Sequence, residues 1–373
     1  MSRHSSLLGA PQNRTAPARF TCRAVSVAML VAVVGCATVA EAQTGPSVPP
    51  PRGHVEEMAE HLSRLQLSEP VTSRGLAVYS LQLIDGPELA GPWQTLDEAE
   101  GRGEIDIREK GAGHVPHVIV ENLSRRCNIF ILAGELVSGG KQDRAFKEDV
   151  ALRPGQQATV PVYCVEKGRW RHDGKFSAGG GLAPQSIREA LAKSAPQSEI
   201  WDRVRSANAS LGSRNATDSL AKALASPELI RRRKELRDDL LGGHPAGTTG
   251  YIFVYRGAAV GAELFGDQEL ARRLLPKLID AYAVDCVLIR SPHPRAIEDR
   301  HWRPHEHQAA VEFYRTLRTI GSRYTSTPGT GRGVASDGAG KVGRGVCVGD
   351  AVAHYGLAVV RRPIIRPTPR YRE

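Results

Sequence analysis

The sequence predicts a mixed α+β fold in which helices pack against a mainly antiparallel sheet. Between residues 75 and 166, short apolar runs follow one another too closely for helical crossovers. After residue 180 the apolar period changes from that of strands to that of helices. We find no internal repeat, so the sequence indicates a single domain after an N-terminal targeting segment.

The first half of this domain is predicted to hold strands and little helix. A short helix is expected at residues 55–67 and a helical turn at residues 95–100. Strands are expected at residues 75–84, 104–108, 115–121, 128–132, 149–152 and 159–166. Residues 128–132 are continuously apolar, which is typical of a strand buried on both faces. Residues 153–156 carry proline and glycine in type II turn order and join the last two strands.

The second half is predicted to be richer in helices. Helices are expected at residues 184–193, 197–211, 227–241, 267–282 and 304–320. Strands are expected at residues 251–255, 258–263, 284–290, 345–349 and 353–360. Arg256-Gly257 should turn a hairpin, and Pro276 should kink its helix. The glycine-rich residues 329–345 are expected to form a mobile loop.

The first 42 residues have the pattern of a cleavable signal peptide. Residues 1–23 contain four arginines and no acid, and an apolar run follows at residues 24–35. That run is too short to span a membrane as a helix. Residues 40–42 read Ala-Glu-Ala, so cleavage would make Gln43 the new N-terminus. The sequence therefore predicts an exported protein, periplasmic or secreted.

A lipoprotein is the alternative form of export. Val33-Val34-Gly35-Cys36 resembles a lipobox, and a lipidated Cys36 would hold the protein on a membrane. Valine stands where leucine is preferred three residues before the cysteine, so simple cleavage is favoured. Contact with a membrane is expected only if Cys36 is lipidated.

The remaining sequence divides into three parts. Residues 43–70 form a linker and short helix, residues 71–362 the domain, and residues 363–373 a basic tail rich in proline and arginine. The whole chain has a formal net charge of +10. No nucleic-acid-binding motif accompanies this charge, so no specific nucleic-acid partner is predicted. The oligomeric state is left open.

Two polar segments, residues 134–144 and 161–170, carry the candidate functional residues. If their strands are neighbours, these side chains converge on one charged pocket. The candidates for a general base are Glu135 and Glu166, and those for ligand binding are Gln142, Arg144, Arg169 and Trp170. The alternative is that the charges form a structural ion-pair network and Trp170 belongs to the core.

Cysteines and histidines give no cofactor or metal site. Four cysteines follow residue 42, namely Cys127, Cys164, Cys286 and Cys347, and none forms a C-x-x-C pair. Both disulfides and buried free thiols remain open for them. Histidines cluster at residues 293–307 but do not form H-E-x-x-H, so no metal ligand is predicted.

The chain resembles the ARG and Rhodanese-Phosphatase-superfamily-associated Protein domain, a domain of unknown function. The resemblance covers roughly residues 70–360 and is carried by residues 95–99, 134–135, 142–144 and 164–170. The last stretch, Cys-Val-Glu-Lys-Gly-Arg-Trp, is its most specific part. The family usually has asparagine where this chain has Asp143, which adds a negative charge to the expected ligand side.

The family's name implies a place near ADP-ribose or nucleotide metabolism. We therefore expect an exported protein that binds, and in the stronger form of the hypothesis hydrolyses, a small anionic ligand of nucleotide or ADP-ribose type. The alternative is a non-catalytic envelope protein that holds a partner or an anionic polymer through its surface and tail.

Overall fold

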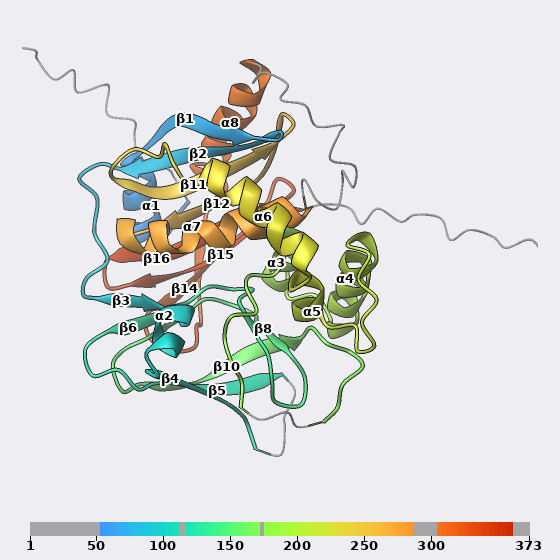
Figure 1. Ribbon diagram of the computed structural model, residues 1–373. Helices are drawn as coiled ribbons and strands as arrows, with labels where there is room; N and C mark the ends of the chain where they lie inside the picture. Colours follow the sequence, from blue (N-terminus) through green and yellow to red (C-terminus); the bar gives the residue numbers. More distant parts are fainter. Residues whose placement is uncertain (1–52, 112–115, 172–174, 286–303, 361–373) are drawn as a thin grey trace, which may run out of the picture. The chain divides into compact units, whose positions relative to one another are not determined.

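The structure is a computed structural model that describes residues 53–111, 116–171, 175–285 and 304–360. All of them belong to one compact unit, Val48–Glu373. The expected signal peptide, Cys36, Cys286 and the basic tail lie outside the described residues. Helices accompany three mostly antiparallel sheets, which confirms the predicted α+β class (Figure 1).

The largest sheet has eight antiparallel strands. Their order is β1 (Leu65–Ser73), β2 (Leu76–Leu83), β11 (Thr248–Tyr255), β12 (Ala258–Phe265), β16 (Ala351–Val359), β15 (Lys341–Val348), β14 (Arg332–Gly338) and β13 (Arg323–Thr325). As predicted, β11 and β12 form a hairpin through Arg256 and Gly257, which both have positive φ. Neighbouring residues of β2 enter different cores, because Val78 and Tyr79 point to opposite faces.

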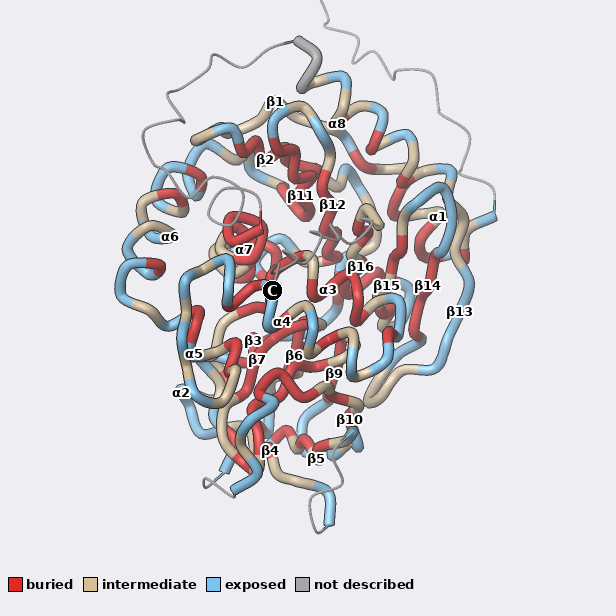
Figure 2. The backbone as a smooth tube through the Cα atoms, turned by 90° about the vertical axis from the view of Figure 1, so that its right-hand side faces the viewer, coloured by how far each residue is buried: buried red, intermediate tan, exposed pale blue. Residues whose placement is uncertain are grey.

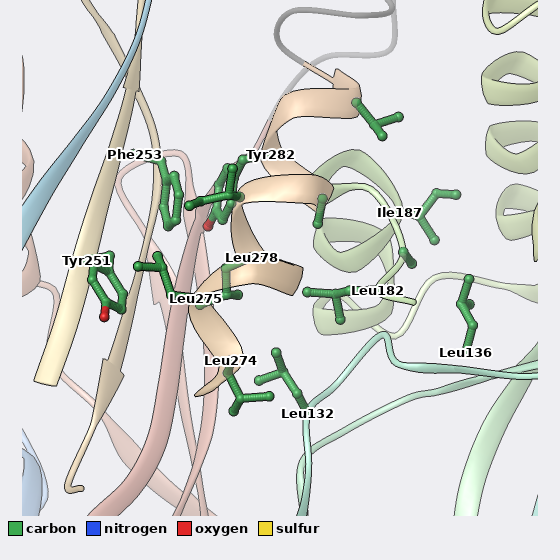
Figure 3. Packing of buried hydrophobic residues seen from close by; sticks show 14 of the residues in the cluster. Leu132, Leu136, Leu182, Ile187, Tyr251, Phe253, Leu274, Leu275, Leu278 and Tyr282 are labelled. Atoms are coloured by element: carbon green, nitrogen blue, oxygen red, sulfur yellow. The ribbon is translucent and has the colours of Figure 1, made fainter. Parts of the chain in front are cut away.

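Helices cover both faces of this sheet. One core contains residues of α3 (Gln185–Ala192), α4 (Gln197–Ser210), α6 (Pro227–Leu240) and α7 (Gln268–Ala283), and the other contains residues of α1 (Glu56–Ser63) and α8 (Pro304–Leu317). Figure 3 shows Leu275 and Leu278 of α7 beside Tyr251 and Phe253 of β11. Burying each leucine stabilises the fold by roughly 1.5–3 kcal/mol. The helix continues through Pro276.

Of the two smaller sheets, the five-stranded one carries both polar segments. The five-stranded sheet has the order β4 (Ile105–Glu109), β5 (His117–Asn122), β10 (Gln157–Cys164), β8 (Arg144–Phe146) and β7 (Leu136–Val137). The three-stranded sheet has the order β3 (Trp93–Thr95), β6 (Asn128–Ile131) and β9 (Val150–Leu152), with β3 and β6 parallel. Figure 2 shows buried residues along β6 as well as along β11 and β12. The predicted turn at residues 153–156 thus joins strands of different sheets.

Two further helices, α2 and α5, are short. The predicted turn at residues 95–100 is α2 (Leu96–Gly101), which begins with a capping box between Thr95 and Glu98. A further helix that the sequence did not predict is α5 (Leu220–Leu224), capped by Ser219.

Two elements differ from the prediction in where they end or begin. The helix expected at residues 55–67 ends at Ser63, because the chain from Leu65 onward pairs with β2 as the edge strand of the large sheet. The strand expected at residues 284–290 does not begin at Val284, whose backbone is still helical after α7. Residues 286–290 lie outside the described part of the chain.

The glycine-rich stretch is not a mobile loop but part of the large sheet. Its residues form the hairpin of β14 and β15, which turns through Ala339 and Gly340 at positive φ. A Cβ atom on Gly345 would lie 2.7 Å from the Cα atom of Tyr355 in the paired strand β16. Glycine here therefore reflects close packing between strands and not flexibility.

Candidate functional site

Strands β8 and β10 bring the two predicted polar segments together. Arg144 and Cys164 are directly paired in the antiparallel register. The start of β8 therefore meets the end of β10, and residues 139–143 lie beside residues 165–169. The neighbouring strands that the sequence prediction required are present.

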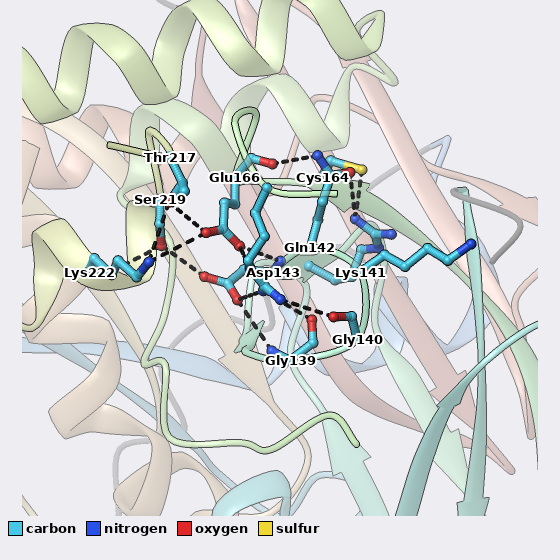
Figure 4. A network of polar contacts seen from close by, with 12 residues as sticks. Gly139, Gly140, Lys141, Gln142, Asp143, Cys164, Glu166, Thr217, Ser219 and Lys222 are labelled. Carbon is cyan, nitrogen blue, oxygen red and sulfur yellow. Dashed lines mark hydrogen bonds and ion pairs between the residues drawn. The ribbon is translucent and has the colours of Figure 1, made fainter. Parts of the chain in front are cut away.

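Arg169 connects the two acids of the resulting network, Asp143 and Glu166, which Figure 4 shows close together. Its Nε lies 2.7 Å from Glu166 Oε2, and its Nη2 lies 2.9 Å from Asp143 Oδ1. It also donates to the carbonyl oxygens of Gly140 at 2.9 Å and Gly139 at 3.2 Å. One guanidinium therefore fixes both acids and the loop between β7 and β8.

The remaining oxygens of both acids accept from the segment around α5. Thr217 Oγ1 donates to Glu166 Oε1 at 2.6 Å, and Ser219 Oγ donates to Asp143 Oδ2 at 2.8 Å. Lys222 Nζ lies 3.7 Å from Glu166 Oε1. Burial alone would raise the pKa of Glu166, but hydrogen bonds from Thr217 and Arg169 outweigh it and lower that pKa. Burial raises the pKa of Asp143.

Arg144 and Gln142 lie inside this network and not on a ligand-facing wall. Arg144 is 1% exposed and donates from Nη1 to Gln142 Oε1 at 3.3 Å and to Cys164 Sγ at 2.8 Å. Gln142 Nε2 donates to the carbonyl oxygen of Glu166 at 2.8 Å. Burial raises the pKa of Cys164, and the charge of Arg144 opposes that shift.

Glu135 has a different set of partners. It is fully buried, and its carboxylate pairs with Lys277 of α7 and accepts from the backbone N–H of Leu132 at 2.8 Å. Burial raises its pKa, and the charge of Lys277 opposes that shift. Lys277 also lies 2.8 Å from Asp97 Oδ2. The structure therefore brings together Gln142, Arg144, Glu166 and Arg169, whereas Glu135 belongs to an ion pair with α7.

Trp170 is exposed, unlike the core tryptophan of the alternative prediction. Its relative accessibility is 57%, and Lys141 Nζ lies 5.4 Å from the centre of its ring. Lys167 Nζ lies 5.3 Å from the ring centre of Trp201, and the Lys222 side chain is also 57% exposed. We call Lys141, Lys167, Trp170 and Lys222 the basic rim, because each of them adjoins a residue of the Arg169 network in sequence or lies near one in space.

A second buried cluster, which we call the His354 cluster, was missed by sequence reasoning. Arg188 pairs with Glu263 at 2.5 Å, and Tyr282 OH donates to Glu263 Oε1 at 2.8 Å. His354 lies between two acids, with Nδ1 2.7 Å from Asp149 Oδ2 and Nε2 2.9 Å from Glu263 Oε2. The signal for it was an acid and a histidine inside the apolar strands β12 and β16, which require buried partners.

The geometry makes His354 an imidazolium. Both ring nitrogens face carboxylate oxygens, so both must carry a proton to donate. Burial lowers the pKa of His354, but Asp149 and Glu263 outweigh it and raise that pKa to about 9. Burial raises the pKa of Glu263, whereas Arg188 and His354 bring it down to about 2. The two acids and two cations therefore neutralise one another.

Neither a disulfide nor a metal site is found among the described residues. Cys127, Cys164 and Cys347 are free thiols. Within the described ranges, no group of three or more His, Cys, Asp or Glu side chains is placed to hold a metal ion. None of the helices described here is long and apolar enough to cross a membrane.

The whole domain matches one family. Residues 64–358 match the model of the ARG and Rhodanese-Phosphatase-superfamily-associated Protein domain. No curated protein and no solved structure gives a match to the chain. The matched range contains the three sheets almost completely, together with the Arg169 network and the His354 cluster. The chain therefore belongs to the ARG and Rhodanese-Phosphatase-superfamily-associated Protein domain family.

Proposed function

We propose that this chain binds a small anionic ligand of nucleotide or ADP-ribose type on the basic rim. The observation that carries the proposal is the exposed indole of Trp170 beside the ammonium of Lys141. An exposed aromatic ring offers a stacking surface for a base, worth about 1–3 kcal/mol. The neighbouring ammonium of Lys141 offers charge-assisted hydrogen bonds to phosphate oxygens.

The Arg169 network supports this surface as a rigid base. It fixes the backbone next to both Lys141 and Trp170. Arg169 donates to the carbonyl oxygen of Gly140, which precedes Lys141, and Arg169 itself precedes Trp170. Fixing the backbone in advance lowers the entropy that binding would otherwise cost. The predicted binding residues Gln142, Arg144 and Arg169 therefore act by positioning, whereas Trp170 contacts the ligand.

The proposal covers binding and not hydrolysis. Glu135 and Glu166, the predicted general bases, are both 0% exposed. Each of their carboxylate oxygens already accepts a hydrogen bond or pairs with a cation. A general base must reach the proton it removes.

A thermal-shift panel of ADP-ribose, nucleotides and sugar phosphates on the purified protein tests the proposal. We expect at least one of these ligands to raise Tm, with the shift lost in Trp170→Ala and reduced in Lys141→Met. Lys234→Met is the control, because Lys234 is an exposed lysine of α6 that pairs with Asp238 at 2.5 Å. No shift with any ligand, or an equal shift in Trp170→Ala, would overturn the proposal.

The closed acids also favour the second candidate, a non-catalytic envelope interaction protein. It predicts that deleting residues 363–373 abolishes retention in the envelope, whereas Glu166→Gln has no phenotype. Both candidates describe an exported protein, and we also propose export, from the pattern of residues 1–42. Cell fractionation with N-terminal sequencing tests export, and a mature protein that begins at Gln43 is the expected result.

A further inference from the structure

A small cavity borders the His354 cluster and is separate from the basic rim. It has a volume of about 30 Å³ and lies among α3, β12, β15, β16 and the residues before β9. The polar and charged side chains that line it are Lys147, Asp149, Gln185, Arg188, Glu263, Arg344 and His354. None of the rim residues lines this cavity.

The acceptors in this wall are engaged by protein donors. Glu263 accepts four hydrogen bonds, two from Arg188 and one each from Tyr282 and His354. Asp149 accepts from the backbone N–H of Ala133 at 2.8 Å and from His354 at 2.7 Å. Every carboxylate oxygen of the cluster therefore already has a donor.

Several donors of the same wall are in surplus. Arg188 is 8% exposed and has five N–H groups, of which four donate, to Ala133, to Gln185 and twice to Glu263. Because Arg188 donates to Gln185 Oε1, the amide orientation is fixed and both N–H groups of Gln185 Nε2 remain. Among the described residues, neither that amide nitrogen nor the ammonium of Lys147 has a hydrogen-bond acceptor or ion-pair partner.

We propose that this cavity binds the carboxylate group of a small organic acid. A hollow with surplus donors and engaged acceptors is complementary to an anionic oxygen group. Its volume accommodates about two water-sized positions, which matches the two oxygens of a carboxylate better than the larger phosphate group.

The balance of charge around the cavity agrees with this ligand. Arg188 and His354 offset Glu263 and Asp149, so the ammonium of Lys147 supplies the additional positive charge. Arg344, at the same cavity, pairs with Asp337 at 3.3 Å. Glu148, next to Lys147 in the chain, is a further acid; burial raises the pKa of its carboxyl group, and the charge of Lys147 opposes that shift.

Two glycines allow polar side chains at the cavity to lie close to the backbone of neighbouring strands. A Cβ atom on Gly356 would lie 2.9 Å from Glu263 Oε2. A Cβ atom on Gly261 would lie 2.5 Å from Tyr282 OH and 3.2 Å from Gln185 Nε2. The close approach of these strands to the polar side chains therefore depends on glycine at both positions.

Thermal-shift titration with sodium acetate, against sodium chloride at matched ionic strength, tests the proposal on the purified protein. We expect acetate to raise Tm in the wild type and the half-saturating concentration to increase about tenfold or more in Lys147→Met. Lys147→Arg should keep most of the response because it keeps the charge. Lys110→Met is the control, since Lys110 is exposed and does not line the cavity.

A second variant separates ligand binding from structural effects. Gln185→Glu keeps an oxygen that accepts from Arg188 but replaces the surplus donor with a negative oxygen, so it should abolish the response to acetate. Equal responses in the wild type and both Lys147→Met and Gln185→Glu would overturn the proposal, as would a stronger response to phosphate than to acetate. Trp170→Ala should leave the acetate response unchanged, so failure of the rim proposal is recognised independently.

Discussion

Alkaline pH should destabilise this fold through His354. The imidazolium bridges Asp149 on the three-stranded side and Glu263 on the eight-stranded sheet, so it connects two sheets. When His354 loses a proton, one of its nitrogens faces a carboxylate oxygen without a hydrogen to donate. The loss leaves buried negative charge uncompensated, which is costly in the protein interior.

The magnitude follows from the raised pKa of His354. That pKa is about 9 in the folded protein and 6.5 for an ordinary histidine. The folded state holds the proton more tightly, so the stabilisation is complete below about pH 6.5 and is lost as pH rises through about 9. A difference of this size contributes roughly 3 kcal/mol to the free energy of unfolding.

Guanidinium unfolding at pH 6.5 and pH 9.5, on the wild type and His354→Gln, measures this effect. The wild type should lose roughly 3 kcal/mol more between the two pH values than the variant does. Lysines, tyrosines and cysteines that titrate in this range act in both proteins and cancel in the difference. Equal losses in the two proteins would refute the imidazolium assigned to His354.

Three further outcomes follow from the same contacts. Arg169→Met should lower stability by about 3–5 kcal/mol, because it removes the cation that both buried carboxylates share. Lys222→Met removes an exposed lysine 3.7 Å from Glu166 and should cost under about 1 kcal/mol. Chemical denaturation compares the two variants. Gly356→Ala should cost about 1–3 kcal/mol by forcing its new methyl group against Glu263, and a lower Tm shows it. Burial lowers the pKa of His61 to about 4, so stability should fall as pH drops from 6.5 towards 4, and His61→Leu should remove that acid sensitivity in unfolding measurements.

Local sequence patterns predicted most of the regular elements. The hairpin at Arg256-Gly257 and the helices α3, α4, α6 and α7 follow from spacing and caps that act within a few residues. Prediction failed where a distant strand decided the outcome. The chain at Leu65 is a strand because β2 lies beside it, and the glycines near residue 345 are in a strand because Tyr355 packs against them.

The candidate site was predicted in part. The sequence predicted that Glu166 and Arg169 meet the segment ending at Arg144 if their strands are neighbours, and the register of β8 and β10 brings them together. Local spacing could not show that Thr217, 51 residues after Glu166, and Ser219, 76 residues after Asp143, complete the hydrogen bonding of both acids. It also could not assign Glu135 to Lys277, which lies 142 residues further along the chain.

By itself, the amino-acid sequence determined the α+β class, most helices and hairpins, and the family, because these depend on short-range periodicity, turn residues and motif identity. Only the tertiary structure decided which charges neutralise one another and which donors remain to meet a ligand. The physical reason is that burial and pairing set the cost of a charge, and both depend on side chains from strands and helices far apart in sequence.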